Sequence, residues 1–256
     1  MIKHIIWKTF VQIDSVLKFP NLQKGEIGIQ LGFDMIAPLT SDLFTMYKRV
    51  KPTGYVLGID PDPRNIDLAK EIIKKKKHNI KLIQKAIFSD KGECELLVGE
   101  SASWNQLNII PIDTTVSFTG NKISVQMDRL DNIINELNIE ILKIGHINLT
   151  INGAEYEALM GMHTVLSEAK NMNLTIVSGR FDESGTINGR PDFEIIVEHL
   201  QKYGFKTKFK RMHQLVWWGF FVKTLLNRKW IYGKDNYGVI MAAKGSKKLK
   251  WYQSFS

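Results

Sequence analysis

Residues 54–73 read GYVLGIDPDPRNIDLAKEII and combine a strand, a turn and the start of a helix. The apolar run at 55–60 is typical of a buried strand. It ends at Asp60, and Asp62-Pro63 then supplies a helix N-cap followed by a first-turn proline, where the missing N–H costs nothing. The segment therefore predicts a strand–helix unit of the kind that builds parallel sheets.

The same alternation of strands and helices extends along the chain in both directions. Apolar runs predict strands at residues 26–31, 80–84, 93–98, 146–151, 174–177, 205–209 and 236–242. Apolar residues at helical spacing predict helices at residues 38–50, 63–75, 130–137, 155–168 and 192–203. This order requires βαβ crossovers, so we expect an α/β fold with a mainly parallel sheet and helices on both faces.

The domain organisation follows from the same pattern. We expect one domain at residues 25–243, with a helical extension at 1–24 and a basic, solvated tail at 244–256. Polar residues interrupt the apolar positions of the extension, so it does not resemble a signal peptide. An insert at 211–235 separates the last two predicted strands.

The excess of basic over acidic residues lies at the end of the chain. The 256 residues contain 35 Lys and Arg against 26 Asp and Glu, a net charge of +9. Residues 201–256 hold 13 of the basic residues and one acid, and four of the six tryptophans. The longest apolar run, at 215–222, is shorter than the roughly 18 residues needed to cross a bilayer. The charge therefore directs attention to one segment rather than to the whole molecule.

Four interpretations of the basic, aromatic insert at 211–235 stay open. It can form a wall whose aromatic faces stack on a sugar acceptor, or it can contact a membrane surface peripherally through aromatic and snorkelling basic side chains. It can also form an oligomer contact or a core-packing helix. We do not expect nucleic-acid binding, because no RNA-binding motif accompanies the basic residues.

Cysteine and histidine content excludes several kinds of site. The single cysteine, Cys94, rules out an internal disulfide and a cysteine-rich metal centre. We expect its side chain to be chemically inert. We also expect a cytoplasmic protein, because one cysteine is typical of a reducing compartment. The six histidines lack metal-ligand spacing, so we expect no metal. His146 lies in a predicted central strand, where a hydrogen-bonded core histidine is expected.

Ligands of doubly wound sheets bind at the carboxyl ends of the strands. Gly32 follows the first strand, where it lets the backbone approach a ligand or simply serves the strand–helix turn. Asp60 follows the second strand, where a carboxylate can accept hydrogen bonds from both hydroxyls of a ribose. Because Asp62 is the better-placed helix cap, we favour the ligand role for Asp60.

Polar residues also follow the strand at 146–151. Thr150 and Asn152 alternate with Asn148 and predict a polar pocket. Alternatively, Asn152 caps the next helix and Glu155 completes a capping box. Both interpretations stay open at this point.

Four blocks in this order resemble the FkbM-type methyltransferases over about residues 25–243. Besides residues 54–73, they are HNIKLIQKAIFSDKGECELLVGE (78–100), ISVQMDRLDNIINELNIE (123–140) and INLTINGAEYEALMG (147–161). The resemblance implies a Rossmann-like class I fold with a seven-stranded sheet and S-adenosylmethionine as cofactor. It also implies methyl transfer to an oxygen, typically a sugar hydroxyl of a glycan, glycolipid or related small acceptor.

Several residues depart from the family pattern. Where the family has a motif like IDVGANIG, this chain has Gln30 for the acid, Asp34 for the asparagine and Ile36 for the second glycine. In the DVEGAE motif, Thr150 replaces the aspartate and Asn152 replaces the first glutamate. These departures motivate a second hypothesis, a catalytically silent ligand- or partner-binding module of the same descent.

The resemblance also implies roles for individual residues. We expect cofactor contacts from Gly32 and Asp34 near the methionine end, from Asp60 and Pro61 at the ribose, and from the backbone of Lys85 and Ala86 at the adenine. The catalytic candidates are the polar groups of the pocket, Thr150, Asn152 and Glu155. Other acids that remain as candidate bases are Asp34, Asp182 and Glu183.

Overall fold

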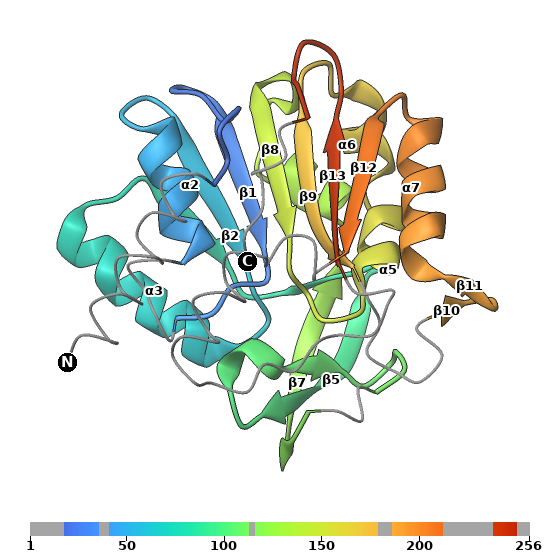
Figure 1. The fold of residues 1–256 in the computed structure, drawn as a ribbon. Helices are drawn as coiled ribbons and strands as arrows, with labels where there is room; N and C mark the ends of the chain where they lie inside the picture. The colour runs from blue at the N-terminus through green and yellow to red at the C-terminus, as the bar shows by residue number, and fades with distance from the viewer. Residues whose placement is uncertain (1–17, 36–40, 113–115, 179–185, 212–237, 250–256) are drawn as a thin grey trace, which may run out of the picture.

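The computed structural model describes residues 18–35, 41–112, 116–178, 186–211 and 238–249. In this part of the chain, seven strands form one sheet in which β13 is antiparallel to both neighbours and the other strands are parallel (Figure 1). Their order is β12 (Lys206–Arg211), β13 (Gly238–Ala243), β9 (Asn173–Ser178), β8 (Ile144–Leu149), β1 (Ile27–Leu31), β2 (Tyr55–Ile59) and β3 (Ile80–Ile83). The predicted mainly parallel α/β sheet is confirmed.

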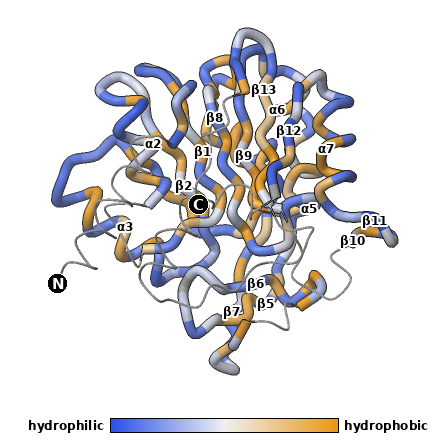
Figure 2. Tube along the Cα trace, viewed as in Figure 1, coloured by the Kyte–Doolittle hydropathy of each residue, from blue (hydrophilic) through white to orange (hydrophobic). Residues whose placement is uncertain are grey.

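Helices cover both faces of this sheet, as predicted. One face carries α2 (Asp42–Val50) and α3 (Pro63–Lys76). The other carries α4 (Leu130–Glu136), α5 (Glu155–Met160), α6 (His163–Glu168) and α7 (Asp192–Lys202). Alternate residues of β1 face the two helical layers. Ile29 and Leu31 pack against the layer of α4 to α7, whereas Gly28 faces Met46 of α2. Figure 2 shows hydrophobic residues gathered along the central strands.

The strand–helix unit quoted first has the predicted caps. The Oδ1 of Asp62 accepts a hydrogen bond from the backbone N–H of Arg64 at 2.9 Å, and Pro63 opens the helix α3. The helix ends at Lys77, which adopts a left-handed conformation with φ 51°. Three lysines in the last turn interact favourably with the negative end of the helix dipole.

A second, four-stranded sheet lies below the carboxyl ends of the main strands in Figure 1. It contains β4 (Ala86–Ile87), β7 (Phe118–Asp128), β5 (Gly92–Gly99) and β6 (Gln106–Leu107), with the 3-10 turn η1 (Ala102–Trp104) between β5 and β6. The strand predicted at 93–98 is β5, but β7 was not predicted, because most of its side chains are exposed and form no apolar run. Cys94 is buried on β5, and burial raises the pKa of its thiol, as expected of an inert cysteine.

Two predicted helices differ from those observed. The helix predicted at 155–168 is two helices, α5 and α6, because the chain turns at Gly161, where a Cβ would clash with the carbonyl oxygen of Phe88. The helix predicted from residue 38 is described from Asp42 onward, and residues 36–40 lie outside the described part. The turn-rich segment before α7 contains a short hairpin of β10 (Thr186–Ile187) and β11 (Arg190–Pro191).

The ends of the chain are only partly described. Most of the predicted extension at 1–24, and the insert at 211–235 except Arg211, lie outside the described residues. The tail prediction is wrong at Lys247, whose side chain is 6% exposed and whose Nζ lies 2.6 Å from Oε1 of Glu26. The same Nζ donates to the carbonyl oxygen of Asn21 at 2.7 Å, so the tail is anchored to the domain at this point. No helix in the described part of the chain is long and apolar enough to cross a membrane.

Candidate functional site

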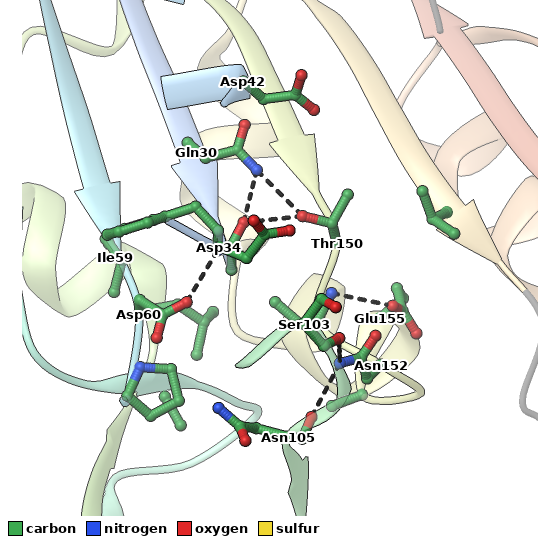
Figure 3. Close-up of a pocket in the computed structure, with 18 of the residues that line it drawn as sticks. Gln30, Asp34, Asp42, Ile59, Asp60, Ser103, Asn105, Thr150, Asn152 and Glu155 are labelled. Atoms are coloured by element: carbon green, nitrogen blue, oxygen red, sulfur yellow. Dashed lines mark hydrogen bonds between the residues drawn. The ribbon is translucent and has the colours of Figure 1, made fainter. Parts of the chain in front are cut away.

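A cavity of about 360 Å³ lies at the carboxyl ends of β1, β2 and β8, bounded on one side by the small sheet (Figure 3). This volume falls within the range of small-molecule sites. Nine residues that the sequence analysis expected to bind the cofactor or take part in catalysis lie in the wall of the cavity: Gly32, Asp34, Asp60, Pro61, Lys85, Ala86, Thr150, Asn152 and Glu155. The structure therefore brings these positions, distant in sequence, to one place.

Gly32 occupies a crossing of two backbones. Its φ is +70°, and a Cβ there would clash with the carbonyl oxygen of Thr150. Its N–H donates to the carbonyl oxygen of Ile59 at 2.8 Å, while the N–H of Thr150 donates to that of Leu31 at 2.9 Å. The glycine is thus required by the packing of β1 against the end of β8, whether or not a ligand also approaches it.

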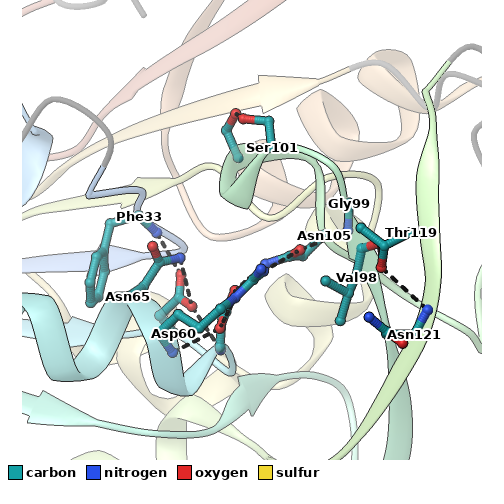
Figure 4. A network of polar contacts seen from close by, with 12 residues as sticks. Phe33, Asp60, Asn65, Val98, Gly99, Ser101, Asn105, Thr119 and Asn121 are labelled. Carbon is teal, nitrogen blue, oxygen red and sulfur yellow. Dashed lines mark hydrogen bonds and ion pairs between the residues drawn. The ribbon is translucent and has the colours of Figure 1, made fainter.

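Asp60 is a buried carboxyl on the cavity wall, 5% exposed. Its Oδ2 accepts from the N–H of Phe33 and its Oδ1 from the N–H of Asp62, both at 2.8 Å (Figure 4). Burial raises its pKa to about 7, although these hydrogen bonds oppose the shift. Nδ2 of Asn65 also donates to Oδ1, at 3.4 Å. Oδ2 therefore keeps a second lone pair with which Asp60 can accept a hydrogen bond from a hydroxyl in the cavity.

Asn152 does not cap the following helix. It has a left-handed backbone with φ 56°, and Ala154 occupies the N-cap position of α5. Its Nδ2 instead donates to the carbonyl oxygens of Ser103 at 2.8 Å and Asn105 at 2.9 Å. The capping interpretation of Asn152 is therefore wrong, and its amide holds a segment of the small sheet.

That segment, residues 101–105, is here called the strap. At its other side, Nδ2 of Asn105 donates to Oδ2 of Asp62 at 2.6 Å, and Oδ1 of Asn105 accepts from the N–H of Gly99 at 3.0 Å (Figure 4). Although burial raises the pKa of Asp62, hydrogen bonds from Arg64 and Asn105 lower it below its usual value overall. The strap thus joins the start of α3 to the exit of β8. The sequence analysis did not identify this segment, because it carries no motif and no apolar run.

Glu155 lies at the start of α5 and is 3% exposed. Its Oε2 accepts from the N–H of Gly153 at 2.9 Å and its Oε1 from the N–H of Ile151 at 3.3 Å. Because Ala154 is the N-cap, Glu155 is the first residue of α5 and its hydrogen bonds do not form the predicted capping box. Burial, and the negative charge of Asp192, raise the pKa of Glu155 to about 8.

The residues that replace family acids are hydrogen-bonded within the protein. Nε2 of Gln30 donates to the carbonyl oxygen of Gly32 at 2.7 Å and to Oγ1 of Thr150 at 3.1 Å. Oγ1 of Thr150 donates to the same carbonyl oxygen at 2.8 Å. An amide and a hydroxyl can donate here, whereas ionised carboxylates would have placed negative charge against that oxygen.

The remaining candidates have the following positions. Nζ of Lys85 lies 2.7 Å from Oδ2 of the buried Asp128. His146 is fully buried, its Nε2 lies 2.9 Å from Oγ1 of Thr175, and burial lowers its pKa to about 3, so it is a neutral core residue. Asp182 and Glu183 lie outside the described residues.

The model of the FkbM methyltransferase domain matches residues 27–207, which is most of the chain. This chain belongs to the FkbM methyltransferase family. Among curated proteins, no sequence matches it. Solved structures with a similar fold include fibrillarin from Aeropyrum pernix in complex with S-adenosyl-L-methionine (11% identity, TM-score 0.47, covering 92% of this chain and 74% of that one). An rRNA methylase from Streptococcus thermophilus is also similar (8% identity, TM-score 0.45, covering 93% and 95%).

The FkbM methyltransferase uses S-adenosylmethionine, which supplies an activated methyl group on a sulfonium. The cavity suits this cofactor in size, and it has a buried carboxyl, Asp60, that can accept hydrogen bonds from ribose hydroxyls. Within the described residues, no group of His, Cys, Asp and Glu side chains is arranged to hold a metal ion.

Proposed function

We propose that this FkbM methyltransferase transfers the methyl group to an oxygen, on a sugar hydroxyl of a glycan, glycolipid or related small acceptor. The observation that carries the proposal is Glu155, a carboxyl on the cavity wall whose pKa is raised to about 8. A base of this pKa is close to working pH, where general-base catalysis is most effective.

Held by Asp60, Gly32 and Asp34, S-adenosylmethionine would supply an activated methyl group for transfer to the acceptor oxygen and would leave as S-adenosylhomocysteine. The hydroxyl proton passes to the Glu155 carboxylate, and Thr150 and Asn152 shape the surrounding pocket. Holding the acceptor in line with the methyl group supplies most of the rate enhancement, because the reactive group belongs to the cofactor.

The proposed cofactor contacts follow the order of residues along the cavity. Asp60 and Pro61 face the ribose, and the backbone of Lys85 and Ala86 faces the adenine. Gly32 and Asp34 lie toward the methionine end. The burial and hydrogen bonding of Asp60 support its assignment, because its oxygens are fixed before a ligand arrives.

The test uses the full chain, methyl-labelled S-adenosylmethionine and a panel of soluble glycans and glycolipids. Label in a product that survives mild alkali indicates a methyl ether and supports the proposal, whereas alkali-labile label indicates an ester and contradicts it. With an acceptor identified, Glu155→Gln is expected to lower kcat at least 100-fold while the Kd of the cofactor stays within about threefold. Glu157→Gln, on the same helix, is the control. Cofactor binding without transfer to any acceptor would instead support the silent module.

We also infer that the protein acts in the cytoplasm, with the insert at 211–235 contacting the acceptor or a membrane surface. The composition of this insert supports the membrane contact, since it combines Trp and Phe with several Lys and Arg residues. Flotation with anionic liposomes should fall when residues 213–232 are deleted. Unchanged flotation would contradict the membrane contact.

A further inference from the structure

A buried row of polar side chains runs from the end of β1 to the start of α2. Gln30 and Asn148 are register partners on adjacent parallel strands and are 1% and 2% exposed. Nδ2 of Asn148 donates to Oε1 of Gln30 at 2.8 Å and to Oδ2 of Asp42 at 3.0 Å. The neutral amides between sheet and helix therefore lead to a charged group on α2.

Asp42 forms an ion pair with a residue that precedes β1. Nζ of Lys18 lies 2.8 Å from Oδ1 of Asp42, and the two side chains are 10% and 15% exposed. Both residues line the same cavity as Asp60. Figure 3 shows Asp42 beyond Gln30, on the side away from Asp60. The cavity thus has a buried carboxyl toward one end and an ion pair toward the other.

We propose that Lys18 and Asp42 form the subsite for the amino-acid end of S-adenosylmethionine. This inference rests on the proposed placement of the ribose at Asp60. With the adenosine there, the methionine part extends past Gly32 and Gln30 toward the ion pair. Its carboxylate then faces the ammonium of Lys18, and its ammonium faces the carboxylate of Asp42.

The charges of this subsite match the ligand. The methionine end of the cofactor is a zwitterion, so a paired cation and anion complement both of its groups. An unpaired charge would favour a singly charged ligand instead. Hydrogen bonds between ionised groups are stronger than neutral ones, so each contact contributes to affinity and to orientation of the sulfonium.

The pair also accounts for the departure at Gln30. The family motif places an acid at this position, on the strand β1. In this chain the strand carries a neutral amide, and the negative charge comes from Asp42 on α2, joined to Gln30 through Asn148. In this chain, the negative charge at this end of the cavity therefore lies on the helix α2 and not on the strand β1.

Two ligands distinguish a subsite from a structural ion pair. S-adenosylhomocysteine carries the amino-acid end, and 5′-methylthioadenosine has the same adenosine and thioether without it. Calorimetry on the full chain measures the Kd of both for the wild type, Asp42→Asn and Lys18→Met. We expect each variant to bind S-adenosylhomocysteine at least tenfold more weakly and 5′-methylthioadenosine within twofold of the wild type.

Asp67→Asn is the control, because it breaks an exposed ion pair with Lys70 on α3. The inference would be overturned if the variants lost affinity equally for both ligands, or lost none for S-adenosylhomocysteine. If Asp42→Asn does not fold, Lys18→Met tests the inference independently. If Asp60→Ala weakens both ligands while Asp42→Asn weakens neither, only the subsite fails. If Asp60→Ala weakens neither, the ribose placement fails.

Discussion

The side-chain amide of Asn152 donates to the backbone carbonyl of Asn105, 47 residues earlier in the sequence, at 2.9 Å. The family motif has a glutamate where this chain has Asn152. A carboxylate accepts hydrogen bonds and cannot donate one to a carbonyl oxygen. The substitution therefore creates a connection between the exit of β8 and the strap that the family residue cannot make.

Asn152→Asp is expected to release the strap. It keeps the shape of the side chain and tolerates a left-handed backbone, but it removes both hydrogen bonds and places a carboxylate beside two carbonyl oxygens. Amide hydrogen exchange over residues 99–108 should accelerate at least tenfold, and the affinity for S-adenosylhomocysteine should fall several-fold.

The control for this change is Asn121→Asp, which introduces the same charge on an exposed position of β7. Exchange over residues 99–108 should then stay at the wild-type rate. If the two variants behave alike, the strap is held by the rest of the small sheet and the amide of Asn152 contributes nothing measurable.

Asp60 gives a prediction on ligand binding. Asp60→Ala removes the acceptor proposed for the ribose hydroxyls, and hydrogen bonds to a charged group contribute about 1.5–3 kcal/mol each. Calorimetry should therefore show at least a tenfold weaker Kd for S-adenosylhomocysteine. An unchanged Kd would refute the ribose assignment.

Asp60 also makes the stability of the ligand-free protein depend on pH. Its pKa is about 7 in the folded protein and is near 3.9 in an unfolded chain. Between these values the folded protein retains a proton that the unfolded chain has lost, so stability falls as the pH rises, by at most about 1.4 kcal/mol per pH unit. The side chain of the Asp60→Asn variant cannot titrate. Urea unfolding should therefore show that the free energy of unfolding of the wild type falls relative to that of the variant between pH 5 and pH 7.5. A constant difference would show that the carboxyl is not perturbed.

Sequence periodicity predicted the layers of the fold because the main sheet is buried on both faces. Strands such as 55–59 and 144–149 have few or no exposed residues, so they stand out as apolar runs. The small sheet is different, because β7 exposes most of its side chains and so forms no continuous apolar run. A strand that is stabilised mainly by pairing with β5 has only a weak hydrophobic pattern in the sequence.

The sequence predicted those residues of the site that directly follow a strand. Gly32, Asp60 and Thr150 follow strands, and parallel strands bring their carboxyl ends to one edge. Asn105 and Asp42 were not predicted, because they reach the cavity from a loop and from the first turn of a helix. Only the packing of these elements shows that they face the same space.

Lys247 gives a prediction on the chain end. Its Nζ pairs with Glu26, so Lys247→Met leaves that carboxylate without its cation in a site where Glu26 is 23% exposed. We expect a loss of about 1–2 kcal/mol in the free energy of unfolding, between the values for exposed and buried pairs. Lys248→Met, at the exposed neighbouring position, should cost less than about 0.5 kcal/mol. Equal losses for both would mean that residues 244–249 contribute no specific anchor.

Gly32→Ala tests whether the backbone crossing beneath the cavity requires a glycine. Two costs add at this position: a left-handed φ of +70°, and a clash of the new Cβ with the carbonyl oxygen of Thr150. Gly120→Ala is a matched control, because Gly120 has a similar φ of +82° with no atom within 4 Å of the added Cβ. The control should lose about 1 kcal/mol from the backbone alone, and Gly32→Ala should lose at least about 3 kcal/mol. Urea unfolding of the two variants measures the difference, and equal losses would show that β8 moves away from β1 at little cost.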